Sequence, residues 1–123
     1  MILKDSFYTI QRRHTDSELP AYDIRLNPDH YIYQAHFPGE PVTPGVCLLQ
    51  IARELLEDYL QATLEIRSVK NMKFLAIVSP EETPEVTARF DKISQDAGTV
   101  TAQFTVCMPE REFVKLTFSL TVA

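Results

Sequence analysis

Residues 43–61 read TPGVCLLQIARELLEDYLQ, and this stretch decides the fold. Its apolar residues recur every three or four positions, the spacing of one face of an α-helix. They are Leu48, Leu49, Ala52, Leu55, Leu56 and Tyr59. We expect Thr43 to cap the helix and Pro44 to suit its first turn. Cys47, within the helix, is expected to be a packing residue and not a nucleophile. The polar residues are expected on the opposite, solvated face, namely Arg53, Glu54, Glu57, Asp58 and Gln61.

The sequence around this helix predicts strands. Apolar and polar residues alternate over residues 114–122, which is typical of a half-buried strand, and again over 86–91 and 99–106. Further strands are expected at 6–13, 21–27 and 66–78, the last with a bulge around Lys70 and Asn71. A single amphipathic helix must bury its apolar stripe on one sheet. The pattern therefore predicts an α+β domain, over residues 1–123, with one helix on an antiparallel sheet.

Composition narrows the functional class. The 123 residues suit a single domain, and the net charge of -5 argues against binding to nucleic acid. The longest apolar stretches have about five residues, far short of the roughly 20 that span a bilayer, so no membrane insertion is expected. Cys47 and Cys107 are too few for a disulfide scaffold. Two free thiols and an N-terminus without an apolar leader segment predict a cytoplasmic protein.

Residues 36–46 read HFPGEPVTPGV and carry the candidate chemistry. His36 titrates near neutral pH and lies in a turn stiffened by Pro38 and Pro41, with Gly39 between them. Gly45 lies in the first helical turn, where backbone N–H groups are unpaired and the helix dipole favours negative charge. A histidine base beside such a donor can remove a proton α to a carbonyl. The alternative is a rigid turn whose histidine only binds backbone groups.

This stretch resembles the active-site segment of the (3R)-hydroxyacyl-acyl carrier protein dehydratases of fatty acid synthesis. Their motif, His-Phe-Pro-Gly-x-Pro-x-x-Pro-Gly-Val, matches at every fixed position here. The resemblance implies a hot-dog fold, in which an antiparallel sheet wraps a long central helix. It also implies that His36 exchanges the C2 proton and that the Gly45 N–H polarises the thioester carbonyl. By the same resemblance, four residues contact the substrate: Phe37, Gly39, Pro44 and Val46.

The sequence departs from the family at Gln50, fourteen residues after the histidine, where the family has a carboxylic acid that protonates the C3 hydroxyl. An amide has no proton to give, and losing a general acid reduces the rate by about 10²- to 10⁴-fold. Three interpretations stay open. In the first, Gln50 holds the hydroxyl or a water while His36 moves both protons. In the second, Glu54, one turn along the helix, is the substitute acid. In the third, the site hydrolyses acyl thioesters or binds them without turnover.

The resemblance also suggests partners. The substrate is expected on the phosphopantetheine arm of acyl carrier protein or coenzyme A, with no metal and no other cofactor. The family dimerises edge to edge, with the histidine and the acid from different subunits, so a homodimer or a trimer of dimers is expected. Arg12 and Arg13 either contact an acidic carrier or form a solvated pair. The remaining candidates are expected at the surface or in turns (His14, His30) and in the sheet (Tyr31, Tyr33).

Overall fold

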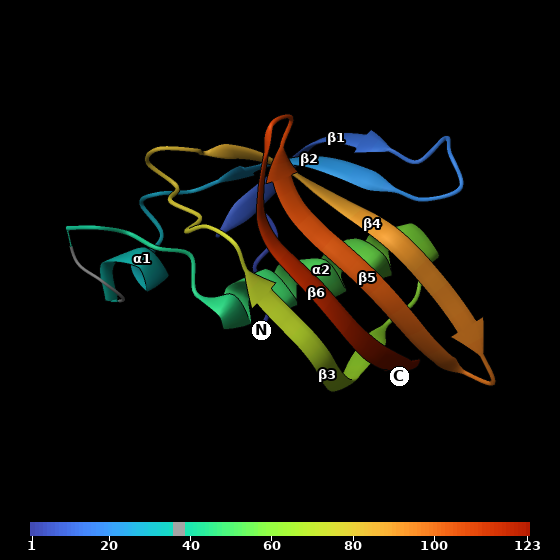
Figure 1. The fold of residues 1–123 in the computed structure, drawn as a ribbon. Helices are drawn as coiled ribbons and strands as arrows, with labels where there is room; N and C mark the ends of the chain where they lie inside the picture. Colours follow the sequence, from blue (N-terminus) through green and yellow to red (C-terminus); the bar gives the residue numbers. More distant parts are fainter. Residues whose placement is uncertain (36–38) are drawn as a thin grey trace.

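The computed structural model describes residues 1–35 and 39–123, which form six strands and two helices (Figure 1). In chain order they are β1 Tyr8–His14, β2 Ala21–Leu26, α1 Tyr31–Ala35, α2 Gly45–Leu60, β3 Leu64–Phe74, β4 Glu85–Asp96, β5 Thr99–Met108 and β6 Arg111–Val122. All strand pairings are antiparallel, in the spatial order β1-β2-β4-β5-β6-β3. Helix α2 lies along one face of this sheet. The predicted α+β class and the hot-dog arrangement are confirmed.

Helix α2 is held on the sheet by its apolar stripe. Its buried residues are Cys47, Leu48, Ile51, Ala52, Glu54, Leu55 and Leu56. Full burial of a large aliphatic side chain contributes about 1.5–3 kcal/mol, so the aliphatic residues of this set fix the rotation of the helix about its axis. The N-cap is Pro44, without a side-chain cap, and the predicted Thr43 cap is wrong. The Thr43 hydroxyl instead shares a 2.8 Å hydrogen bond with the Tyr33 hydroxyl.

A short helix, α1, replaces the predicted extended chain at Tyr31 and Tyr33. Two side chains upstream of it bind backbone N–H groups and start the turn. Asn27 Oδ1 accepts from the Asp29 N–H at 3.0 Å, and His30 Nδ1 accepts from the Ile32 N–H at 3.1 Å. Such local bonds compete with strand pairing. The assignment of both tyrosines to the sheet was therefore wrong.

Strand β3 forms one edge of the sheet and pairs with β6. Its register slips twice, between Ile66 and Ser68 and between Val69 and Asn71, so the predicted bulge is confirmed. The strand ends at Phe74, four residues before the predicted end. Beyond it, the N–H groups of residues 75 and 76 both donate to the Phe113 carbonyl, at 2.8 and 3.1 Å, and the chain leaves the ladder.

Neither helix of the described residues is long and apolar enough to cross a membrane.

Candidate functional site

An apolar cavity of about 400 Å³ opens at the start of α2. It lies between the chain that enters the helix and the chain that leaves β3. Its lining residues are Val42, Thr43, Pro44, Gly45, Leu48, Phe74, Leu75, Ala76, Ile77 and Val78. A mostly apolar lining with a few polar groups is typical of a site that binds a small organic ligand. Two of the predicted site residues, Pro44 and Gly45, therefore meet at a cavity.

Gly45 is the first residue of α2, so its N–H has no acceptor within the helix. The Phe74 ring packs directly against it: a Cβ built on Gly45 would lie 2.8 Å from Phe74 Cζ. Phe74 as a whole is 58% exposed. Phe74 therefore packs beside Gly45 and limits the space around it while remaining accessible from solvent. Sequence reasoning missed this contact because the two residues are far apart in the chain.

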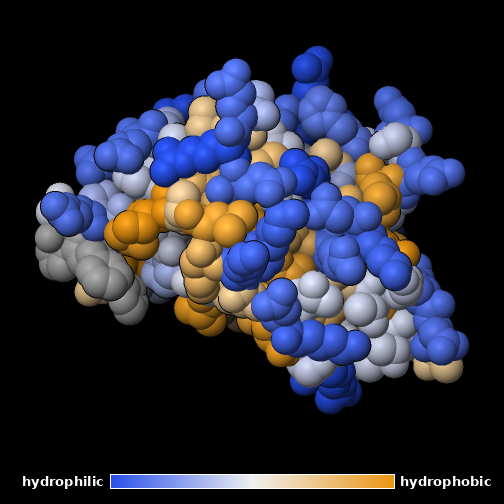
Figure 2. Space-filling model, viewed as in Figure 1, coloured by the Kyte–Doolittle hydropathy of each residue, from blue (hydrophilic) through white to orange (hydrophobic). Residues whose placement is uncertain are grey.

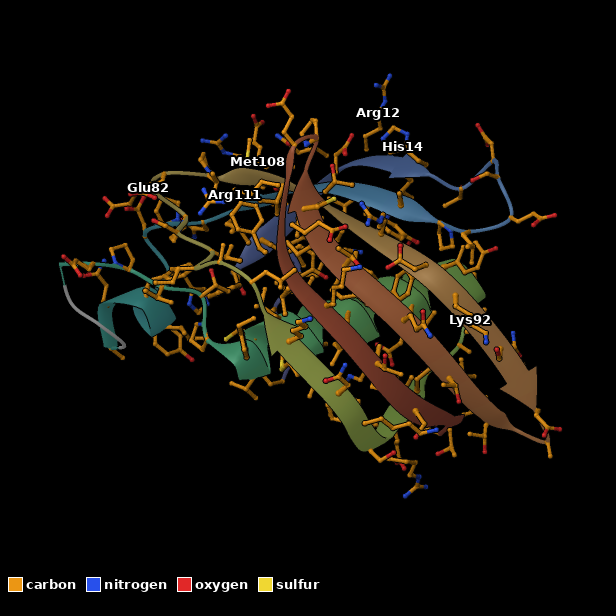
Figure 3. All side chains as sticks on the ribbon, in the orientation of Figure 1. Arg12, His14, Glu82, Lys92, Met108 and Arg111 are labelled. Atoms are coloured by element: carbon orange, nitrogen blue, oxygen red, sulfur yellow. The ribbon has the colours of Figure 1, made fainter. Side chains whose placement is uncertain are left out.

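The other residues of the motif are distributed differently. Val46 is 65% exposed and does not line the cavity. Gly39 lines a neighbouring hollow of about 730 Å³, which Glu82 and Arg111 also border (Figure 3). His36 and Phe37 lie outside the described residues. The structure thus brings Pro44 and Gly45 together and leaves Val46 on the surface.

Gln50 faces away from this cavity. It lies five positions after Gly45 in the helix, which corresponds to a rotation of about 140° and a rise of about 7.5 Å. Its amide Nε2 donates to the Met1 carbonyl and to Glu54 Oε2, both at 2.6 Å. Within one chain, Gln50 therefore meets the N-terminal segment and not the Gly45 cavity.

Glu54 is 8% exposed, so its predicted place on a solvated face was wrong. The N-terminal segment folds over it and supplies three further donors to its carboxylate: the Leu3 N–H at 2.7 Å, the Lys4 N–H at 2.8 Å and the Tyr8 hydroxyl at 3.0 Å. Burial and the neighbouring Glu54 raise the pKa of Tyr8 far above its ordinary value, so this hydroxyl stays a donor. With four donors around it, the carboxylate acts here as an acceptor.

The two candidate arginines for carrier binding differ in their surroundings. Arg13 forms a two-pronged ion pair with Asp58 of α2, with both nitrogen–oxygen distances at 2.9 Å. This ion pair, and a hydrogen bond from Tyr22, lower the pKa of Asp58. Arg12 is exposed and extends from β1 into solvent (Figure 3). Arg13 thus ties β1 to the helix, whereas Arg12 forms no ion pair with any residue that the structure describes.

The remaining polar candidates are structural. His14 and His30 lie as predicted, His14 exposed beside Asp23 at 2.8 Å and His30 in the turn before α1. Cys47 and Cys107 are free and buried, and burial raises the pKa of both thiols. Within residues 1–35 and 39–123, no three histidine, cysteine or acidic side chains gather closely enough to hold a metal ion.

The model of the ApeI-like family, described as ApeI dehydratase, matches residues 11–115. A curated relative from Latilactobacillus sakei, the 3-hydroxyacyl-[acyl-carrier-protein] dehydratase FabZ, is 32% identical over 94 residues. That match covers 71% of this chain and 67% of the relative.

Solved structures show the same fold. The dehydratase heterocomplex ApeI:P from Xenorhabdus doucetiae has a TM-score of 0.66 at 18% identity, covering 91% of this chain and 96% of that chain. A thioesterase from Haemophilus influenzae has a TM-score of 0.64 at 18% identity, covering 96% of this chain and 79% of that chain. At these identities the likeness concerns the fold, which dehydratases and thioesterases share.

Proposed function

We propose that this chain, which belongs to the ApeI-like dehydratase family, eliminates water from a 3-hydroxyacyl thioester to give a trans-2-enoyl thioester. One observation carries the proposal. The complete motif from His36 to Val46 leads into a helix whose first residue, Gly45, lines an apolar cavity. Curated relatives that act as 3-hydroxyacyl-acyl carrier protein dehydratases support the same reaction.

The reaction needs one proton to move from carbon to oxygen. In our proposal His36 takes the C2 proton while the Gly45 N–H binds the thioester oxygen, where negative charge develops. The C2–C3 double bond forms as the C3–O bond breaks. His36 then returns its proton to the departing hydroxyl, which leaves as water. Gln50 accepts a hydrogen bond from that hydroxyl and orients it. Because His36 takes one proton and returns it, the histidine begins and ends neutral.

The substrate is proposed to arrive on a phosphopantetheine arm, from acyl carrier protein or coenzyme A, and no further cofactor is proposed. The cavity beside Gly45 suits the apolar part of such a thioester, because aliphatic and aromatic side chains dominate its lining. Phe37, outside the described residues, and Gly39, Pro44 and Val46 are proposed to contact the substrate. The cytoplasmic location remains a prediction.

We also propose a homodimer formed through β3. This strand is at an edge of the sheet, and unpaired edges are normally paired or covered. Figure 2 shows apolar surface interrupting the hydrophilic surface on the viewed face. Exposed apolar residues on or near β3 and the cavity are Val46, Val69, Phe74, Leu75 and Ile77. In each chain Gln50 faces away from that chain's own Gly45 cavity. The second chain would therefore supply its Gln50 to the cavity of the first.

Two other assemblies are alternatives to a simple homodimer. A trimer of dimers would keep the same β3 pairing. A heterocomplex is the second, because the solved relative from Xenorhabdus doucetiae is one. In that case a different hot-dog chain would face His36 and bring its own acid.

The assembly is tested by Val69→Asp. Val69 lies near the middle of β3 and is 43% exposed, so across a two-fold axis the introduced charge would face its own copy. Light scattering should give a dimer for the unchanged chain and a monomer for the variant. Leu19→Asp, at an exposed apolar residue between β1 and β2, is the matched control and should stay dimeric. A monomer before any substitution would contradict the shared site.

The activity is tested by following enoyl absorbance with 3-hydroxyacyl and trans-2-enoyl thioesters on carrier protein. Turnover in both directions would support the dehydratase. Release of free thiol from acyl-coenzyme A would instead favour a thioesterase. Carrier binding with neither product would favour a thioester-binding protein, and both of these results would overturn the proposal.

A further inference from the structure

The amide of Gln50 has a fixed orientation. Both of its Nε2 hydrogens are used, one on the Met1 carbonyl and one on Glu54 Oε2. Turning the amide over would place Oε1 against these two acceptors, which is unfavourable. The described residues therefore leave Oε1 as the one hydrogen-bonding atom of Gln50 for a ligand.

Glu54 is the stronger of the two anchors, because it is charged and itself immobilised. Its four donors come from Gln50, from two backbone N–H groups at the N-terminus and from the Tyr8 hydroxyl. Hydrogen bonds to an ionised acceptor are roughly twice as strong as those between neutral groups. Glu54 thus links Gln50 to the N-terminal segment through one buried carboxylate.

We propose that Glu54 is a positioning residue that holds the Gln50 amide with Oε1 outward, as a hydrogen-bond acceptor for the substrate hydroxyl. This inference rests on the proposed dehydration, in which that hydroxyl is the leaving group. Glu54 then supplies no proton itself. It gives Gln50 one defined role, which is to orient the hydroxyl for the proton that His36 returns.

The first test observes Gln50 directly, by ¹⁵N-edited NMR of the full chain. The side-chain amide signals are assigned by their loss in Gln50→Glu. In Glu54→Gln one of the two acceptor oxygens is replaced by a donor group, so the Gln50 amide signals should shift and exchange with water about tenfold faster or more. Glu57→Gln is the matched control, because Glu57 lies on the same helix and accepts the Leu64 N–H at 2.8 Å. Unchanged Gln50 signals in Glu54→Gln would overturn the inference.

The same variants separate positioning from folding in the activity assay. Glu54→Gln should lower kcat about tenfold or more, with a much smaller change in KM, because a misdirected acceptor acts on the reacting geometry. Glu57→Gln should keep the kcat of the unchanged chain. If that chain shows no dehydration at all, the proposed function fails, while the NMR comparison still decides whether Glu54 fixes the amide.

A second substitution guards against misfolding of Glu54→Gln. Gln50→Glu places two carboxyl groups where a 2.6 Å hydrogen bond now joins Gln50 and Glu54. Two carboxyl groups at such a short distance cannot both ionise easily. They should therefore titrate as a coupled pair that keeps one proton near neutral pH. Carboxyl ¹³C shifts followed against pH provide the measurement. Two independent titrations in the ordinary acidic range would overturn the inference.

Discussion

Two stretches of the same helix differ sharply. At its first residue, Gly45 offers a backbone N–H beside an apolar cavity that Phe74 partly covers. Five positions on, the half-buried Gln50 and the buried Glu54 form a hydrogen-bonded pair tied to the N-terminal segment. In the proposed reaction the first stretch binds the acyl thioester and the second binds a hydroxyl. Because the two stretches face different directions, we propose that each chain contributes one of them to a site shared between two chains.

The largest effect is expected at the motif itself. His36→Ala should lower the dehydration rate by about 10²- to 10⁴-fold, because it removes the group that moves the proton. The rate is measured as enoyl absorbance at saturating substrate. His14→Ala is the control, since His14 is exposed on β1 and pairs only with Asp23 among the described residues. Equal rates for the two variants would remove His36 from the mechanism.

The polar half is expected to dominate stability. Glu54→Leu should lower the free energy of unfolding by about 3 kcal/mol, because two backbone N–H groups and the Tyr8 hydroxyl lose a buried charged acceptor. Urea denaturation followed by circular dichroism measures the difference. A loss below about 0.5 kcal/mol would mean that water replaces the carboxylate freely, and the N-terminal segment would then be only loosely held.

The apolar half is expected to respond through shape. Gly45→Ala should reduce kcat/KM about tenfold, because the new methyl group would press on the Phe74 ring and shift the cavity wall. The double variant Gly45→Ala with Phe74→Leu should recover part of the loss, since it removes the ring atom at 2.8 Å. Full activity in the single variant would show that the cavity beside Gly45 does not bind the reacting group.

The smallest effect is expected at Asp58, near the far end of α2. The ion pair with Arg13 lowers the pKa of Asp58 below its ordinary 3.8. Its contribution to stability is therefore present above pH 4 and is lost as the pH falls through the lowered value. Asp58→Asn should lower the free energy of unfolding by about 1 kcal/mol at pH 7. The gap should narrow at pH 3, and a gap that widens there would contradict this account.

Local patterns in the sequence predicted the scaffold well. The apolar period over residues 43–61 and the alternation over 114–122 correspond to α2 and β6, because each element buries one face in the shared hydrophobic core. The motif likewise placed Gly45 at a helix start. Such patterns describe neighbours along one element, and they succeed where burial follows the period of the helix or the strand.

Long-range contacts explain what was missed. Glu54 looked solvated because its covering segment lies about 50 residues away, and no periodicity reports that contact. The contact of Phe74 with Gly45 joins a strand end to a helix start in the same way. The short helix α1 was missed for a local reason, since side-chain bonds from Asn27 and His30 outweighed the strand-like residues.

The hydrogen bond between Gln50 and the Met1 carbonyl has a practical consequence for work at the bench. A purification tag joined directly ahead of Met1 would add bulk and motion next to the amide that we propose orients the hydroxyl. Activity measured with such a fusion would then reflect the tag as well as the chain itself. A tag placed after Ala123, whose N–H donates to the Thr63 carbonyl at 2.8 Å, leaves that amide undisturbed.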